Sequence, residues 1–511
     1  MLKIKTIIFK FTIILLSLCF LSTVSGCTAQ KVNTDQIKFG LGQEPSTLDP
    51  NMMSDGYSFQ VAANIFEGLL NITDDLTIEP LLAKDWKISD DGLIYTFYLE
   101  ENVYFHNGEH FTASDVKFSF DRSIEGGYNS TGRSVIDYTT VINNFTVEVH
   151  LKYPYAPALE LFASQYMRIV SEKAVEDCGN SFKYEPIDAG TGPYIYVSWI
   201  SGDRIILKAN DNYWRGKPQV SKIVFKFYND SNTRAIAVEG GEIQYASVSA
   251  ASYQTLVKAE GINVAVVPSM ITNYLAFNCS VAPFDNAYVR QAVAYCFDNN
   301  NALLAGTGNE KSGTVTNQFI VQGSEFYCDE LNDYAKDVEK AKALLTKAGY
   351  PEGFQTQIYT SNANTLKNIA TFLQDALKEI GIEAEIVVLE QAALNETIRA
   401  GGCPVFLYNF NGFASDPDFC FYTQYYTDQT LNYAKCDNKE LNSLLADARA
   451  TIDTDQRKII YDAVSKIVNE ECYYIPLYNM NFLYGYDERL TGSFSSFSRI
   501  YAYDFRWNIE E

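Results

Sequence analysis

Alternating apolar and polar positions mark the strands that this chain is expected to form. Between residues 94 and 99 the side chains are mostly β-branched or aromatic and face opposite sides in turn, which is typical of a buried strand. Asn107-Gly108 then favours a tight turn, and Thr112 is suited to cap a helix that starts after it. Other strands are expected at 37–41, 103–105, 146–151, 194–200, 204–209, 222–227, 382–389 and 473–486.

A repeat of three to four residues between apolar positions predicts the helices. Gly349 and Gly381 directly follow two such segments and are suited to end them in the left-handed conformation. Helices are expected at 59–70, 285–297, 337–348, 366–380, 438–450 and 456–469, with acidic residues at or near the start of four of them: Asp285, Asp337, Asp437 and Asp455. Because strands and helices alternate, and because 511 residues exceed one ordinary core, the sequence predicts an α/β protein of two or three domains.

The first 26 residues have the pattern of a secretory signal peptide. Three lysines precede an apolar stretch, 11–21, that is too short for an ordinary membrane span. The signal ends at Val24-Ser25-Gly26-Cys27, which resembles a bacterial lipobox with Cys27 as the lipid-modified first residue of the mature chain. An uncleaved signal anchor is the alternative, but the small residues before Cys27 favour cleavage. We therefore expect a polar tether at 27–36 and a body held by its lipid at the extracytoplasmic face of the cell membrane.

The composition is that of a folded, acidic protein. Hydrophobic residues make up 47% and aromatic residues 14% of the chain, which argues against a disordered protein. The net charge of −23 argues against nucleic-acid binding, because that binding needs a basic surface. Eight cysteines follow Cys27, and their spacing selects no disulfide pairing, so disulfides and free thiols both stay open.

The segment His106-x-x-Glu109-His110 has the spacing of a zinc-protease motif. Such a site needs both histidines on one face of a helix together with a third ligand. Asn107-Gly108 instead places these residues in a turn, and His150 is the one other histidine of the chain. We therefore interpret the segment as a turn and expect neither a metal site nor a cofactor.

Other catalytic patterns are weak. The stretch 306–312 lacks the glycine-lysine order of a phosphate loop, and no G-x-S-x-G occurs. Asp416 and Asp418 could serve glycoside hydrolysis, but carboxylates are plentiful in this chain and usually lie on solvated faces. The residues therefore favour a binding protein over an enzyme, and a secreted hydrolase or peptidase is the less favoured alternative.

A series of short motifs runs through most of the mature chain. They are Leu48-Asp49-Pro50, NIFEG (64–68), PLLAKDW (80–86), YTF (95–97), FHNG (105–108), FTASDVKFS (111–119), GTGPY (190–194), PFD (283–285), VRQA (289–292), AKALL (341–345) and AGYPEG (348–353). Each motif is weak alone, but their common order is specific. Together they resemble the ABC-transporter substrate-binding proteins of the dipeptide, oligopeptide and nickel class, which form bacterial extracellular solute-binding protein family 5.

The resemblance implies a two-lobed α/β fold of the class II periplasmic-binding-protein type, with an extra family-specific subdomain in the first lobe. The implied parts are the first lobe at 37–54, 188–270 and 478–511, the subdomain at 55–187, and the second lobe at 271–477. Two crossing segments, 269–274 and 475–479, would form the hinge about which the lobes close on a ligand.

In peptide-binding members of this family, a W-x-x-D-Y-x-x-P segment pairs with the peptide, and its Asp grips the α-ammonium. Here Phe410 takes the Trp position and Phe413 the Asp position, while Asp416 matches a second acid seen in many members. Either the ligand has no α-amine there, or Glu44, Asp416 or Asp418 replaces the missing charge. An alignment shifted by a few residues is the other possibility.

The resemblance also implies a set of ligand-binding residues and a function. The candidates are Gln43 and Glu44 in the first lobe, Tyr274 at the hinge, and Tyr408, Asn409, Phe410, Asn411, Gly412, Phe413 and Asp416 in the second lobe. Tyr408 and Phe410 could instead be core aromatics. We expect a monomeric receptor that delivers an extended, fairly apolar ligand such as a peptide to the permease and ATPase of an ABC importer. A nickel chelate, another small solute and a signalling peptide are the alternatives.

Overall fold

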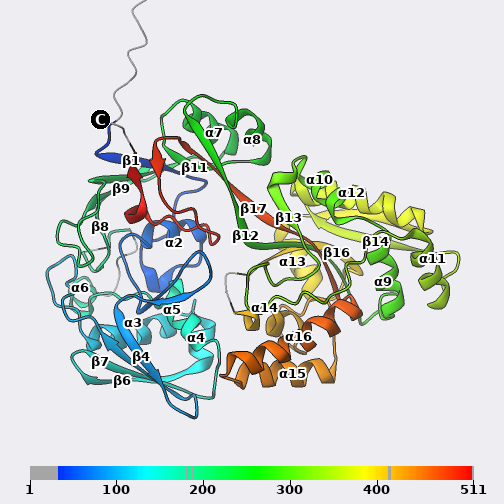
Figure 1. Cartoon of the computed structure of the whole chain (residues 1–511), viewed down its shortest axis with the longest axis horizontal. Coiled ribbons are helices and arrows are strands. Elements are labelled where there is room, and N and C mark those ends of the chain that lie inside the picture. Colours follow the sequence, from blue (N-terminus) through cyan, green and yellow to red (C-terminus); the bar gives the residue numbers. More distant parts are fainter. Residues whose placement is uncertain (1–32, 180–181, 183, 187, 413–415, 509–511) are drawn as a thin grey trace, which may run out of the picture.

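The computed structural model describes residues 33–179, 182, 184–186, 188–412 and 416–508. The predicted lipidation site, Cys27, and the predicted ligand-binding residue Phe413 lie outside the described residues. Figure 1 shows two lobes joined by two long strands, β12 (Ile262–Phe277) and β17 (Tyr474–Asp487). The two-lobed α/β fold expected from the sequence is confirmed.

One mixed sheet of eleven strands passes through both lobes. From the second lobe to the first, its order is β15 (Ile382–Leu389), β14 (Phe354–Ser361), β16 (Val405–Asn411), β12, β17, β11 (Tyr245–Ser247), β1 (Gln36–Leu41), β10 (Lys222–Phe227), β9 (Arg204–Ala209) and β8 (Tyr194–Ile200), and β13 (Gly313–Val315) pairs with β17. The strands expected between residues 194 and 227 are therefore confirmed with their bounds.

The crossing strands β12 and β17 pair in antiparallel register from one lobe to the other, but this pairing is interrupted where the lobes meet. The register shifts between Pro268 and Thr272 and again between Asn273 and Tyr274. Thr272 spans the interruption by donating its hydroxyl to Asn479 Oδ1 at 2.8 Å. Because irregular pairing loosens and bends a ladder, this place suits a hinge, and the predicted hinge segments, 269–274 and 475–479, include it.

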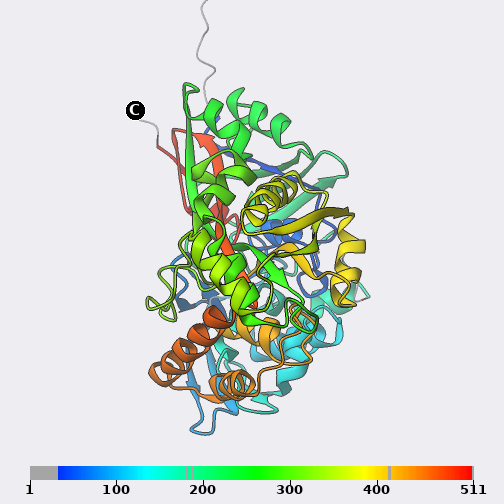
Figure 2. The same ribbon diagram turned by 90° about the vertical axis from the view of Figure 1, so that its right-hand side faces the viewer.

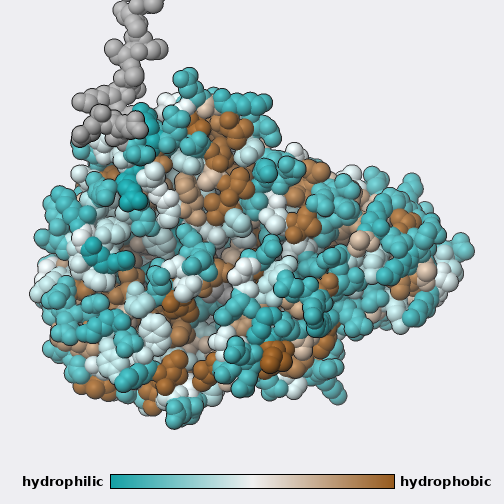
Figure 3. All heavy atoms as spheres, in the orientation of Figure 1, coloured by the Kyte–Doolittle hydropathy of each residue, from teal (hydrophilic) through white to brown (hydrophobic). Residues whose placement is uncertain are grey.

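Helices cover both faces of the sheet in the second lobe. They are α9 (Ala287–Tyr295), α10 (Asn299–Thr307), α11 (Val338–Lys347), α12 (Asn364–Glu379), α13 (Gln391–Arg399), α14 (Pro417–Tyr425), α15 (Lys439–Ala450) and α16 (Thr454–Glu471). Two cores result, one around Phe277, Ile358 and Leu373 and the other around Phe406 and Phe421. Figure 2 looks onto this lobe, with the orange helices α15 and α16 at its lower end. In Figure 3 its outer surface is mostly hydrophilic.

The other lobe contains the chain's N-terminal part and its C-terminal segment, which lies beside β1 (Figure 1). One four-stranded antiparallel sheet, with the order β4 (Ala83–Ile88), β5 (Ile94–Leu99), β7 (Thr146–Leu151) and β6 (Ile136–Asn143), has a core of its own. The remaining elements are α2 (Gly56–Ala62), β2 (Leu70–Ile72), β3 (Ile78–Pro80), α3 (Ala113–Glu125), α4 (Ser130–Val135), α5 (Ala158–Ala163), α6 (Glu172–Asp177), α7 (Ser231–Glu239), α8 (Ala250–Leu256), β18 (Leu490–Thr491) and β19 (Arg506–Trp507). The domain boundaries stay a prediction.

The helix expected at 59–70 is wrong in its second half, because α2 ends at Ala62. The side chain of Asn64 explains the break. Its amide donates to Ile500 O at 2.8 Å, and its oxygen accepts from Ala502 N–H at 2.7 Å. Bonds to a segment more than four hundred residues away thus take the place of another helical turn, and no local pattern reveals them.

Smaller differences concern the ends of elements. Asp337 caps its helix as expected, but the other caps are Asn286, Asn438 and Asp453 in place of Asp285, Asp437 and Asp455. The strand expected at 103–105 is reduced to a single bridge between Tyr104 and His110. Asn and Asp cap helices equally well, so neighbouring acids and amides compete for the cap position.

The two histidines of the suspected zinc motif point to different places. His106 Nε2–H donates to Gly192 O at 2.9 Å, whereas His110 Nε2–H donates to Glu101 O at 2.7 Å. Gly108, with φ of 85°, forms the predicted turn between them. Within the part of the chain that the structure describes, no group of three His, Cys, Asp or Glu residues is arranged to hold a metal ion.

We expect His106 to make stability depend on pH. Burial lowers the pKa of His106 from 6.5 to about 4, and its Nδ1 finds no hydrogen-bond partner among the described residues. Between pH 6.5 and 4 the unfolded chain therefore binds a proton at this histidine, whereas the folded chain does not. The free energy of unfolding falls over this range by up to about 3 kcal/mol. Urea denaturation across this range measures the fall.

His106→Gln keeps a donor for Gly192 but cannot titrate, so it should flatten that pH dependence. His110→Gln, at an exposed position on the same turn, should keep it in full. Equal slopes in the two variants would contradict the role given to His106.

The described residues contain no disulfide bond. All eight cysteines after Cys27 are free thiols, and six of them are buried, among them Cys420 and Cys436. Burial raises the pKa of Cys279 to about 11 and that of Cys472 to about 12, which keeps both thiols protonated and weakly reactive.

Every described helix is too short or too polar to cross a membrane.

Candidate binding site between the lobes

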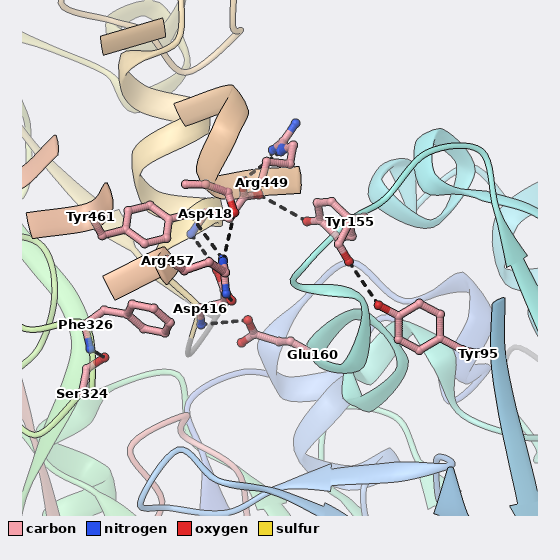
Figure 4. A network of polar contacts seen from close by, with 11 residues as sticks. Tyr95, Tyr155, Glu160, Ser324, Phe326, Asp416, Asp418, Arg449, Arg457 and Tyr461 are labelled. Carbon is pink, nitrogen blue, oxygen red and sulfur yellow. Dashed lines mark hydrogen bonds and ion pairs between the residues drawn. The ribbon is translucent and has the colours of Figure 1, made fainter. Parts of the chain in front are cut away.

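Among the described residues, hydrogen bonds join the second lobe to the four-stranded-sheet part of the other lobe, and we call the following three the closing contacts. Glu160 Oε2 accepts the backbone N–H of Asp416 at 2.8 Å. The hydroxyl of Tyr155 donates to Asp418 Oδ2 at 3.3 Å, and Ala156 N–H donates to Arg449 O at 2.9 Å. Figure 4 shows how Glu160 and Tyr155 reach toward the two aspartates from the opposite lobe. The structure therefore shows the lobes in contact at this end.

The aspartates of the closing contacts are neutralised within their own lobe. Arg457 binds both carboxylate oxygens of Asp416 at 2.7 Å, and Arg449 binds those of Asp418 at 2.9 and 2.7 Å (Figure 4). The side chains of Arg457 and Asp416 are 5% and 12% exposed, so little water screens their charges. Asp416 also caps α14 by accepting from Asp418 N–H at 2.9 Å. Neither carboxylate is thus left with a full charge for a ligand ammonium.

A cavity of about 230 Å³ lies next to the closing contacts, between the two lobes. Residues from five separate parts of the chain line it: Ile72, Tyr128–Thr131, Tyr155, Pro157, Glu160, Leu161, Ser164–Tyr166, Phe419, Phe497 and Arg499. Five of these residues are aromatic and seven are polar or charged, and Glu160 and Arg499 are the charged members of this set. Aromatic side chains together with polar groups at defined places are typical of a site for a small organic ligand.

Among the described residues, none of those predicted from the family resemblance lines this cavity, although Asp416 lies beside it in the closing contacts. Tyr274 is 1% exposed and packs against Phe319 and Tyr474. The Glu44 carboxylate accepts from Trp199 Nε1–H at 2.7 Å and from Gly202 N–H at 3.0 Å, so it is engaged within the first lobe.

Apart from Gln43, which follows β1, the other candidates lie on or beside β16. Tyr408 donates its hydroxyl to Asn395, Gly412 N–H donates to Met270 O, Asn411 is half-buried, and Gln43 and Asn409 are exposed. Phe410 comes nearest to the cavity, because its ring lies 5.6 Å from that of Phe419. The assignment of these residues, and of Asp416, to ligand binding stays a prediction.

Arg499, Phe497, Tyr166 and Phe419 line the cavity, but sequence reasoning did not find them. Phe497 and Arg499 belong to the C-terminal segment, which folds back to the cavity from beyond β18. One signal was present, namely an arginine inside a stretch that is otherwise apolar, aromatic and small. Such an arginine is unusual on a solvated face and indicates a buried or paired charge.

Two lobes that are joined by crossing strands and enclose a cavity define a solute-binding protein. Residues 77–432 match the family model described as "Bacterial extracellular solute-binding proteins, family 5 Middle". The chain belongs to this family.

Relatives and solved structures agree with this assignment. The glutathione-binding protein GsiB of Salmonella paratyphi A is 29% identical over 88% of this chain and 90% of its own length. The structure of HbpA2 from Haemophilus parasuis matches with a TM-score of 0.84 at 26% identity, covering 93% of this chain and 100% of that one. The periplasmic binding protein DppA from Helicobacter pylori, in complex with the peptide STSA, matches with a TM-score of 0.75 at 26% identity, covering 93% and 98%. GsiB and DppA are both named as binding proteins.

Proposed function

We propose that this protein is the receptor of an ABC importer and encloses a short peptide, or a solute of similar size and chemistry, between its lobes. Cys27 carries a lipid in this proposal and holds the protein at the extracytoplasmic face of the membrane. The observation that carries the proposal is the cavity between the lobes, whose wall comes from both of them and whose edge bears the closing contacts.

The size of the cavity and the names of the relatives both support a short ligand. GsiB is named for glutathione, a tripeptide, and the DppA structure holds a four-residue peptide. The cavity volume of about 230 Å³ lies below the usual range for small-molecule sites, roughly 300–1,000 Å³. A dipeptide or tripeptide with apolar side chains therefore suits it better than a long extended peptide, and this narrows the ligand expected from the sequence.

Closure about the crossing strands would provide the signal to the importer. An open form can bend at the interrupted pairing of β12 and β17 without breaking a regular ladder. A ligand that contacts both lobes favours the closed form by its extra contacts there, and the closing contacts add to that preference. The permease and ATPase would then meet one defined closed surface.

Native mass spectrometry of the purified protein tests this function, because an enclosed ligand can survive purification. We expect bound masses of short peptides, and we expect addition of a bound peptide at a hundred times its Kd to stabilise the fold by about 2.7 kcal/mol in a thermal-shift assay. A metal-containing mass would favour a chelate receptor, and turnover of the peptide would favour a hydrolase. If neither a bound solute nor a shift with any peptide is found, the proposal is wrong.

A further inference from the structure

Arg499 is a buried cation in the wall of the cavity. Arg499 is 8% exposed, and its guanidinium lies 4.6 Å from the centre of the Phe497 ring. Nη1 donates to the hydroxyl of Tyr501 at 3.2 Å. A guanidinium has five N–H donors, so this contact leaves most of its donors available to a ligand.

Among the described residues, three buried arginines pair with a carboxylate, whereas Arg499, like Arg168 and Arg234, does not. Arg122, Arg290 and Arg457 each pair with a carboxylate, at 2.5, 2.9 and 2.7 Å. Among the described residues, no carboxylate lies within 4.0 Å of Arg499. A buried charge without a partner of opposite sign is unfavourable, and an anionic ligand group would remove that cost.

A second cation strengthens the positive potential at this end of the cavity. Arg168 is 5% exposed and likewise has no carboxylate within 4.0 Å among the described residues. Tyr501 lies between the two arginines. Burial raises the pKa of Tyr501, but the charges of Arg499 and Arg168 outweigh burial and hold that pKa below its ordinary value.

Two acidic groups, Glu67 and Asp74, interact with these arginines, Glu67 with Arg168 and Asp74 with Arg499. The carboxylate of Glu67 accepts hydrogen bonds from Tyr213, Trp214 and Thr191, and burial raises its pKa. Burial also raises the pKa of Asp74, and Arg499 lowers it only in part. Burial thus disfavours the charged forms of both acids, and neither forms an ion pair with Arg499 within 4.0 Å.

Resting on the function proposed above, we infer that Arg499 binds a carboxylate of the enclosed solute, which in a short peptide is the C-terminal carboxylate. Ser164, whose buried hydroxyl finds no partner among the described residues, lines the same cavity and can add a hydrogen bond. Glu160 at the closing contacts gives the cavity a negative group as well. A bound zwitterionic peptide would therefore point its carboxylate to Arg499 and keep it away from Glu160.

Two matched libraries of dipeptides and tripeptides test this inference, one with free C-termini and one amidated. The full-length protein is offered each library, and captured masses are read by native mass spectrometry. We expect capture from the free-acid library and little from the amides. Calorimetry of a captured peptide should show that amidation weakens binding about tenfold to a hundredfold, and that N-acetylation weakens it less.

The variant Arg499→Gln should lose the difference between acid and amide, whereas Arg506→Gln, at an exposed position of the same segment, should keep it. Equal capture from both libraries, or an equal loss on acetylation and amidation, would overturn the role of Arg499 and leave the proposed function standing. Capture from neither library would overturn the proposed function as well. Because the library comparison uses the unaltered protein, it decides the matter even where Arg499→Gln fails to fold.

Discussion

Replacing Arg122 by methionine is expected to lower the free energy of unfolding by about 3–5 kcal/mol, because it leaves a buried carboxylate without its partner. Arg122 on α3 binds both oxygens of Asp49, at 2.6 and 2.5 Å, and each side chain is 5% exposed. Arg122 Nη1 also donates to Asn51 Oδ1 at 3.1 Å. This ion pair ties α3 to the loop that follows β1.

Urea denaturation followed by circular dichroism measures the loss. Arg215→Met, at an exposed position of the same lobe, serves as the matched control and should change stability by about 0.5 kcal/mol or less. Combining Arg122→Met with Asp49→Leu removes both charges and should recover part of the loss. A double variant no more stable than Arg122→Met would show that the unpaired charge is not the cause.

Replacing Glu160 by alanine should weaken solute binding by about tenfold to a hundredfold, the effect of losing one hydrogen bond to a charged group. Glu160 accepts from Asp416 across the lobes, a contact that exists only when they are closed. Without it the closed form is less populated, and the apparent affinity falls by the same factor. Calorimetry with a bound peptide gives the affinity, and small-angle scattering gives the average opening of the lobes.

Two further variants separate closure from direct contact with the solute. Glu176→Ala, an exposed position on α6, is the matched control and should bind normally. Tyr155→Phe removes another closing contact, the bond to Asp418, and keeps the ring that lines the cavity. We expect both Glu160→Ala and Tyr155→Phe to enlarge the ligand-free protein. Unchanged scattering with weakened binding by Glu160→Ala alone would indicate that Glu160 acts on the solute and not on closure.

Much of the fold could be predicted because its signals are local. The strands β8, β9 and β10 follow from alternation between clear breakers, and the predicted bounds match those observed. The helix expected at 59–70 failed where Asn64 bonds to Ile500 and Ala502, since tertiary contacts there replaced a continuing helix.

The site was harder to predict for the same reason. Phe419, Phe497 and Arg499 line one cavity together with Tyr155 and Tyr166, although the sequence separates them widely. Family motifs led instead to β16 and the positions after it, and that reasoning could not anticipate that Arg457 neutralises Asp416. Which charged residues pair between distant segments depends on the three-dimensional path of the chain. The periodicity of apolar residues in the sequence does not encode that path.

The place of β17 in the sheet also affects how the protein assembles during synthesis. In the sheet, β11 lies between β1 and β17. On its β17 side it pairs with residues 484–486, near the end of the described chain. β14, β15 and β16 come from neighbouring stretches and can pair earlier. A nascent chain can thus form much of its second lobe while the first lobe still lacks an inner strand. The wall of the cavity is complete only when the last segment, with Phe497 and Arg499, has been added.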